Sequence, residues 1–228
     1  MLLKVIFGIT RPWPERMFFS VDDRVRKGSS QSFFESRFGG RWAHFFGTLD
    51  FTTLGGAGFA SQKILFKDYL KEFGSPIDSQ KEGLDLSSYD GLSLSILKGD
   101  GKAYCLNLYN SIGEVVDPET GKRESVIEFK YSFTPDPSFN SEVAQLGGDS
   151  DNLARSQVYI PFKDFLPYYR GRLVDAEIML ARDPSFSSKS LILDSSNIKA
   201  LSMMCQSGFG KQSGFFSLFL ESILAYKN

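Results

Sequence analysis

The sequence predicts an all-β protein, built as an antiparallel β-sandwich or jelly roll with short helical turns and long loops. Two observations carry this prediction. Apolar and polar side chains alternate with period two in about eight to ten short segments, and turn-forming residues separate those segments. A hydrophobic content of 42% over 228 residues is ample for one buried core. We therefore expect an N-terminal arm or first strand over residues 1–17 and one sandwich domain over residues 18–228.

The clearest alternation lies in residues 45–52, where Phe45 and Leu49 share one face of the predicted strand and Asp50 lies on the other. This is the pattern of a strand with one buried face. The same pattern predicts strands over residues 91–98, 103–109 and 125–133. The proline and the glycine of residues 117–122 predict a hairpin loop between the last two of these strands.

The remaining predicted strands lie in the second half of the chain, over residues 156–160, 190–194, 198–204 and 214–226. A helix competes for the last segment, but Gly214 and the aromatic residues that follow it favour a strand. The core face of that strand is expected to hold Phe216, Leu218, Leu220, Leu224 and Tyr226. Helical turns are expected only over residues 66–74 and 162–169. The polar stretches around residues 67–90 and 134–154 predict long loops.

Composition argues against several classes of function. The 26 Lys and Arg residues nearly balance the 27 Asp and Glu residues, so the chain has no overall basic charge for binding nucleic acid. No apolar run reaches the roughly 20 residues that span a bilayer, so we do not expect an integral membrane protein. Cysteine, histidine and carboxylates do not cluster at ligand spacing, so no metal site and no cofactor are expected. Cys105 and Cys205 are expected to be free and buried, with a disulfide as the alternative.

A glycine-rich stretch, "LGGAGFASQ", has two interpretations. Gly55, Gly56 and Gly58 would let the backbone approach a phosphate. However, a phosphate-binding loop either leads from a strand into a helix or continues with Gly-Lys-Ser or Gly-Lys-Thr, and here a strand pattern follows. We therefore expect a structural turn between two strands, after which Phe59 enters the core.

The single histidine, His44, invites comparison with a Ser-His catalytic triad, but no nucleophile motif accompanies it. We expect this side chain to be exposed or at a strand edge. Polar residues that could form a catalytic site do not cluster elsewhere in the sequence. We therefore assign no catalytic residues, and an enzyme is the least favoured class of function.

Two short stretches are candidates for binding a partner. In the first, "VDDRV", Asp22 and Asp23 precede Arg24, and Ser29 and Ser30 follow in a polar turn. The two carboxylates could ligate a cation from a loop. We favour the alternative in which they pair with the arginine or accept backbone N–H bonds at a turn.

The second stretch, "YYRGRL", places Arg170 and Arg172 around a glycine and next to Tyr169. Guanidinium groups beside aromatic rings suit the recognition of carboxylates or phosphates. A solvated loop with one structural ion pair explains the same residues equally well. The two basic side chains are nevertheless the strongest local binding signal in the sequence.

Five blocks of the sequence follow one another in a distinctive order: "FFSVDDRVRKGSSQS", "FFGTLDFTTLGGAGFASQ", "YDGLSLSILKGDGKAYCLNLY", "VYIPFKDFLPYYRGR" and "SGFFSLFLESILAY". In order and spacing they resemble the landmarks of the complex I intermediate-associated protein family of thirty-kilodalton assembly factors. The resemblance covers the chain from Phe18 to Tyr226. The first two blocks are its most distinctive part.

The resemblance implies a galactose-binding-like β-sandwich, a fold shared with carbohydrate-binding modules. It also implies a non-catalytic, chaperone-like factor that binds complex I subunits or other assembly factors on the matrix side of the mitochondrial inner membrane, in peripheral contact with that membrane. Because the N-terminus shows no clear presequence, a cytoplasmic protein-interaction module of the same fold is an alternative. A glycan-binding module that stacks sugars on exposed aromatic rings is another.

Overall fold

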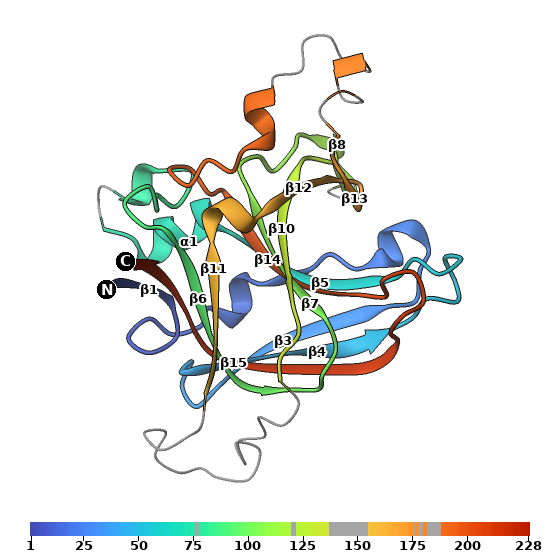
Figure 1. The fold of residues 1–228 in the computed structure, drawn as a ribbon, viewed down its shortest axis with the longest axis horizontal. Helices are drawn as coiled ribbons and strands as arrows, with labels where there is room; N and C mark the ends of the chain where they lie inside the picture. Colours follow the sequence, from blue (N-terminus) through green and yellow to red (C-terminus); the bar gives the residue numbers. More distant parts are fainter. Residues whose placement is uncertain (76–77, 120–121, 137–154, 176, 178–179, 182–187) are drawn as a thin grey trace.

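The computed structural model shows two antiparallel β-sheets packed face to face, as the sequence predicts (Figure 1). It describes residues 1–228 except 76–77, 120–121, 137–154, 176, 178–179 and 182–187. Most of the long loop predicted over residues 134–154 therefore lies outside the described residues.

One sheet, here called sheet A, has the strand order β11-β6-β15-β4-β3, and β1 pairs with β15 beside it. Its strands are β1 (Leu2–Phe7), β3 (Gln31–Arg37), β4 (Trp42–Leu49), β6 (Gly91–Gly99), β11 (Ser156–Pro161) and β15 (Gly214–Lys227). The antiparallel pairing of β1 with β15 places the two ends of the chain side by side, at the left of Figure 1.

The other sheet, sheet B, has the order β13-β12-β10-β7-β14-β5-β2. Its strands are β2 (Phe19–Ser20), β5 (Phe59–Leu65), β7 (Tyr104–Tyr109), β10 (Glu128–Phe133), β12 (Leu166–Tyr169), β13 (Arg172–Leu173) and β14 (Ala200–Gln206). A separate antiparallel pair, β8 (Val115–Asp117) and β9 (Lys122–Arg123), confirms the hairpin predicted between β7 and β10.

The helical elements are short. They are the α-helix α1 (Phe66–Phe73) and the 3₁₀ turns η1 (Glu15–Met17), η2 (Asp23–Arg26), η3 (Asp78–Gln80), η5 (Phe162–Asp164) and η6 (Ser188–Leu191). Helix α1 confirms the predicted helical turn over residues 66–74. Within the described residues, no helix has the length and apolar character needed to cross a membrane.

The core lies between the two sheets. Alternate residues of the central strands β6 and β7 point into it and are at most 1% exposed, namely Leu92, Leu94, Ile96, Tyr104, Leu106 and Leu108. An aromatic cluster extends the core toward the chain ends, where the ring of Phe7 lies 5.2 Å from that of Trp13 and 6.1 Å from that of Phe66. Because Phe7 belongs to β1, the first strand contributes to the same core.

Three details of the sequence prediction were wrong. Residues 190–194 do not form a strand, because η6 and the turn after it are held by local hydrogen bonds, including one from Ile192 N–H to the carbonyl oxygen of Lys189. Residues 162–169 are helical only in η5 and then extend as β12. In β15, irregular pairing near Leu220 changes which side chains face the core, so Ile223 is fully buried and Leu224 is not.

The two cysteines are free and buried, as predicted. They lie on the neighbouring strands β7 and β14, but Cys105 is paired with Met204 and Cys205 with Tyr104. This offset of one residue places the two thiols on opposite faces of sheet B. The geometry therefore excludes a disulfide between them.

Candidate functional site

The carboxylate of Asp22 lies inside the protein, where it links the two sheets. The side chain is only 2% exposed. It accepts hydrogen bonds from the backbone N–H of Ser32 in sheet A, at 3.1 Å, and from that of Ser61 in sheet B, at 2.9 Å. The guanidinium of Arg24 donates to it from the solvent side, at 3.2 Å. Asp22 thus fixes the start of η2 to both sheets.

Asp23 is equally buried and organises the polar turn that follows η2. Its carboxylate accepts hydrogen bonds from the backbone N–H groups of Ser30, at 2.9 Å, and Phe59, at 3.2 Å. The Ser30 hydroxyl also donates to it, at 2.6 Å. Both aspartates therefore accept backbone N–H bonds, which is the alternative that the sequence favoured over cation binding.

The stretch from Asp22 to Ser30 holds five of the residues that the sequence proposed for partner binding. Burial decides which of them a partner can reach. Asp22, Asp23 and Ser30 are at most 2% exposed, so a partner on the protein surface cannot contact them. Arg24 and Ser29 are exposed, and the Ser29 hydroxyl lies 3.0 Å from that of Thr53.

The glycine-rich stretch is a turn that carries the chain from β4 of sheet A to β5 of sheet B. Gly55 and Gly56 have φ angles of +61° and +98°, which L side chains rarely adopt. Gly58 packs so closely that a Cβ atom there would collide with the carbonyl oxygen of Asp50. Phe59 does not enter the core as expected. It faces away from sheet A and is half-buried, because the alternation along β5 assigns the inner face to its even-numbered neighbours.

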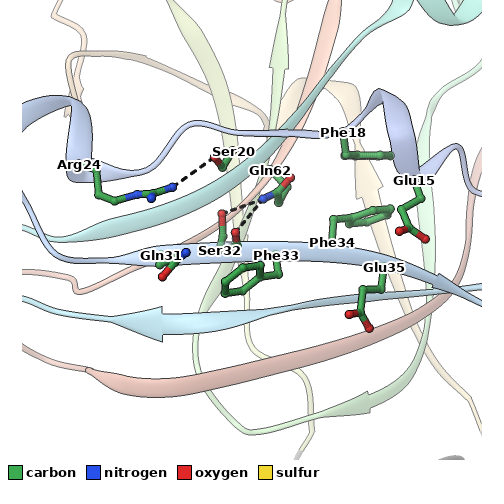
Figure 2. A pocket seen from close by; sticks show the side chains of 10 residues that line it. All are labelled: Glu15, Phe18, Ser20, Arg24, Gln31, Ser32, Phe33, Phe34, Glu35 and Gln62. Atoms are coloured by element: carbon green, nitrogen blue, oxygen red, sulfur yellow. Dashed lines mark hydrogen bonds between the residues drawn. The ribbon is translucent and has the colours of Figure 1, made fainter.

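An open groove with a volume of about 410 Å³ runs along the free edge of β3, the last strand of sheet A (Figure 2). Figure 2 shows Arg24 at one end of the groove and Glu15 and Glu35 at the other. The rings of Phe18 and Phe34 are stacked beside the two glutamates, with their centres 3.9 Å apart, and Ser20, Ser32 and Gln62 lie between these rings and Arg24. The groove is therefore polar in its middle, and its two ends carry side chains of opposite charge.

Carboxylates already occupy most of the hydrogen-bonding edge of β3. The backbone N–H of Ser32 donates to Asp22, and that of Ser36 donates to Glu15 at 2.8 Å. Along a strand, the backbone N–H and C=O groups of every second residue point to the same edge. Those of Phe34, which lies midway between Ser32 and Ser36, therefore point to this edge too. Such partial blocking of an edge strand limits uncontrolled pairing with other chains.

Tyr169, Arg170 and Arg172 form a second exposed surface on the hairpin between β12 and β13. Arg170 adopts φ +50° in the turn, and its guanidinium carbon lies 5.3 Å from the centre of the Tyr169 ring. Neither arginine forms an ion pair with a described residue. Because β13 and β2 are the opposite edges of sheet B, this hairpin and the groove are separate surfaces.

His44 does not lie at a strand edge as expected, because β4 is an inner strand of sheet A. Its ring is stacked between those of Phe219 and Phe46, with centres at 3.9 Å and 4.3 Å. Nε2 lies 2.9 Å from Oγ of Ser217, but Nδ1, where a triad has its carboxylate, has no hydrogen-bond partner in the described part of the chain. Burial, aided by the charge of Arg37, lowers the pKa of His44 to about 4.

This lowered pKa predicts a loss of stability in acid. As the pH falls from 6.5 toward 4, the unfolded chain binds a proton at His44 before the folded protein does, so unfolding becomes more favourable. Urea unfolding should therefore show a midpoint that decreases over this range. The variant His44→Phe, which keeps the ring stack, should show a weaker decrease. An identical pH dependence in both proteins would contradict this assignment.

Comparison with known families identifies the chain. The family model for complex I intermediate-associated protein 30 (CIA30) matches residues 8–220, which is most of the sandwich. The chain belongs to this family. It is also similar to an uncharacterized protein of Schizosaccharomyces pombe, with 35% identity over 224 residues that cover 97% of this chain and 83% of the relative. Membership of the CIA30 family associates the protein with complex I assembly, and both exposed surfaces lie within the matched residues.

Among the candidate residues that the sequence indicated, only Arg24 lines the groove. Glu15, Phe34 and Gln62 were missed, because they come from three different segments and meet only when the edges of the two sheets approach each other. The stretch "RPWPER", residues 11–16, which leads into η1, gave no chemical signal by itself. A signal could have come from β3, where Ser32 and Phe34 lie on one face of the strand and the charged residues Glu35 and Arg37 lie on the other.

Proposed function

We propose that this protein is a non-catalytic assembly factor that binds partly assembled intermediates of mitochondrial complex I on the matrix side of the inner membrane. The observation that carries the proposal is the CIA30 match over residues 8–220. The partners are complex I subunits or other assembly factors. The groove and the β12–β13 hairpin are the surfaces proposed to bind them.

The groove suits an extended polypeptide segment. Phe33, which lines the groove and is exposed, can contact a hydrophobic side chain of the partner, and the polar middle at Ser20 and Gln62 can hydrogen-bond to its backbone. A basic residue of the partner fits the end that holds Glu15 and Glu35. An acidic residue fits the Arg24 end, so the charges also set the direction in which the segment binds.

The hairpin suits an acidic partner surface. Arg170 and Arg172 are exposed and form no ion pairs with the described residues, so binding to carboxylates does not first require breaking an internal pair. Arginine is the residue that pairs best with a carboxylate, because its planar guanidinium donates two parallel hydrogen bonds.

The experiment that tests the proposal is affinity purification of the tagged protein from its own cells, followed by mass spectrometry and fractionation of mitochondria. We expect recovery of complex I subunits or assembly factors from the mitochondrial fraction. A protein recovered from the cytoplasm without such partners would contradict the proposal and favour a cytoplasmic interaction module.

Charge reversal at the hairpin should then reduce the recovery of partners. The double variant Arg170→Glu/Arg172→Glu should lose roughly tenfold in affinity, while its stability should change by less than about 0.5 kcal/mol because both side chains are exposed. The matched control is Lys227→Glu, an exposed charge at the end of β15. Equal recovery of partners with the wild-type protein, the double arginine variant and Lys227→Glu would exclude the hairpin as a binding surface.

Glycan binding has weaker support. Both tryptophans, Trp13 and Trp42, are only 3% exposed, so neither can act as a platform for sugar stacking.

A further inference from the structure

Three loops meet at the end of the sandwich that lies opposite the two chain termini, at the right of Figure 1. They are residues 22–30 around η2, residues 50–58 between β4 and β5, and residues 207–213 between β14 and β15, here called the loop end. The hydroxyl oxygens of Ser29 and Thr53, 3.0 Å apart, connect the first two loops. Oγ of Ser207 donates to the carbonyl oxygen of Gly56, at 2.7 Å, and so connects the last two. The loop end is therefore one connected surface.

Phe209 lies at the tip of the third loop and is 80% exposed, the highest fraction among the large apolar residues that the structure describes. Gly208, Phe209 and Gly210 have φ angles of +58°, +60° and +86°. Phenylalanine rarely adopts this left-handed geometry, because its Cβ atom then crowds the following carbonyl oxygen. Glycine or asparagine would form the same turn with less strain. The chain thus exposes this ring against both its backbone preference and the hydrophobic effect, which indicates a binding role.

A second apolar side chain, that of Val25, is 71% exposed on η2. Basic residues lie beside both apolar tips, since Arg26 and Lys27 follow Val25 and Lys211 comes two residues after Phe209. All three basic side chains are exposed, and none forms an ion pair with a described residue. Exposed apolar and basic groups therefore alternate over the loop end.

The acidic residues of the loop end do little to offset this positive charge. Asp22 and Asp23 are at most 2% exposed, and their carboxylates accept hydrogen bonds from backbone N–H groups inside the protein. The third acid, Asp50, accepts hydrogen bonds from the hydroxyls of Thr52 and Thr53, both at 2.7 Å. The charge that the loop end presents to a partner is therefore mainly positive.

We propose that the loop end binds the surface of an anionic membrane. Phe209 and Val25 insert among the lipid headgroups, and Arg26, Lys27 and Lys211 lie against the lipid phosphates. Separate apolar side chains at loop tips suit a bilayer, because lipid closes around each of them, whereas a protein partner would need a matching pocket for each tip. Basic residues at the surface of an anionic membrane strengthen the attraction.

The inference rests on the proposed function only in naming the mitochondrial inner membrane as the surface that is bound. Lipid binding itself is a property of the purified protein. The test is therefore flotation of the purified full-length protein with vesicles of phosphatidylcholine alone, or of phosphatidylcholine and phosphatidylglycerol in equal parts. Binding to the mixed vesicles should be at least about tenfold tighter and should weaken as salt is added. Absence of binding to the mixed vesicles would overturn the inference.

Replacing Phe209 tests the apolar contact. Phe209→Asn removes the ring and suits the left-handed backbone, so it should keep or raise Tm while weakening binding to the mixed vesicles at least about tenfold. The matched control is Phe73→Asn, because Phe73 is 47% exposed and ends α1, beyond the far end of β5. This control should bind as the wild-type protein does. Unchanged binding by Phe209→Asn would overturn the inference.

Charge reversal tests the basic contact. The double variant Lys27→Glu/Lys211→Glu should weaken binding to the mixed vesicles at least about tenfold. Lys71→Glu/Lys227→Glu changes the net charge by the same amount at exposed positions away from the loop end, and it should bind normally. Equal losses in the two double variants would show attraction by net charge alone and would contradict a specific contact of the loop end.

A tryptophan at the loop tip locates the contact directly. Trp13 and Trp42 are only 3% exposed, so an added exposed tryptophan can be distinguished from them. The fluorescence of Phe209→Trp should shift to shorter wavelength with the mixed vesicles, and lipids with brominated acyl chains should quench it. Phe73→Trp should show neither effect. Equal quenching at both positions would overturn the proposed orientation on the membrane.

The vesicle assay and the recovery of partners can fail separately. Vesicle binding without recovery of complex I subunits or assembly factors would contradict only the assembly role. Recovery of these partners without vesicle binding would overturn only the membrane contact. If Phe209→Asn also lost those partners, the loop end would be a protein-binding surface instead.

Discussion

Replacing Asp22 with alanine should lower the free energy of unfolding by about 3–5 kcal/mol. The substitution leaves the buried backbone N–H groups of Ser32 and Ser61 without an acceptor. Each such orphan donor costs about 1–3 kcal/mol. It also removes a side chain that joins the start of η2 to a strand of each sheet. Urea unfolding monitored by tryptophan fluorescence would measure the loss.

Two further variants test whether the loss of stability comes from the hydrogen bonds of Asp22 or from the removal of any polar side chain in this turn. Asp22→Asn retains one side-chain oxygen and should therefore lose less stability than the alanine variant. Ser29→Ala, in the exposed part of the same turn, should change stability by less than about 0.5 kcal/mol. A loss below about 1 kcal/mol for Asp22→Ala would show that the carboxylate does not hold the sheets together.

The second large effect is expected at Gly58, where alanine should lower the free energy of unfolding by about 3 kcal/mol. The added Cβ atom would overlap the carbonyl oxygen of Asp50, and backbone atoms cannot move aside as a flexible side chain can. Moving the chain would also break the hydrogen bond from the Gly58 N–H to Oγ of Ser207, which joins this turn to the loop before β15. Thermal and urea unfolding would both report the change.

Gly55 provides the matched control in the same turn. A Cβ atom there meets nothing within 4 Å, so alanine would add only the strain of its φ angle of +61°. That strain is about 1–2 kcal/mol. Gly58 has no positive φ, so its larger loss would come from close packing alone. A loss at Gly58 no larger than the loss at Gly55 would show that the backbone relieves the overlap with Asp50 at little cost.

The strands could be predicted because their signal is local. In β6 and β10, apolar and polar residues alternate along the strand, so the type of each residue indicates which face of the sheet it occupies. A few neighbouring residues are enough to identify this pattern. The prediction failed where a local pattern competed with contacts from elsewhere. Leu224 continues the alternation of β15 in the sequence, but irregular pairing with β6 gives the core position to Ile223.

The candidate sites were less predictable, because they combine residues that are distant along the chain. Arg24 and the β12–β13 arginines stood out by residue type alone. The sequence could not show that Asp22 is buried or that Glu15 and Gln62 line one groove, since strand order and register set both facts. Residue type indicates what a side chain can do, and only its neighbours decide whether it does so.

The sequence by itself determined the all-β class, the positions of most strands, the glycine turn and the resemblance to the CIA30 family. These features depend on side-chain alternation, backbone preference and the order of motifs, which are properties of short segments. The tertiary structure alone decided which strands pair and which carboxylates are buried. It also placed the groove at the β3 edge of sheet A and the hairpin at the β13 edge of sheet B. The physical reason is that hydrogen-bond satisfaction and burial depend on groups contributed by both sheets, and these meet only in the folded protein.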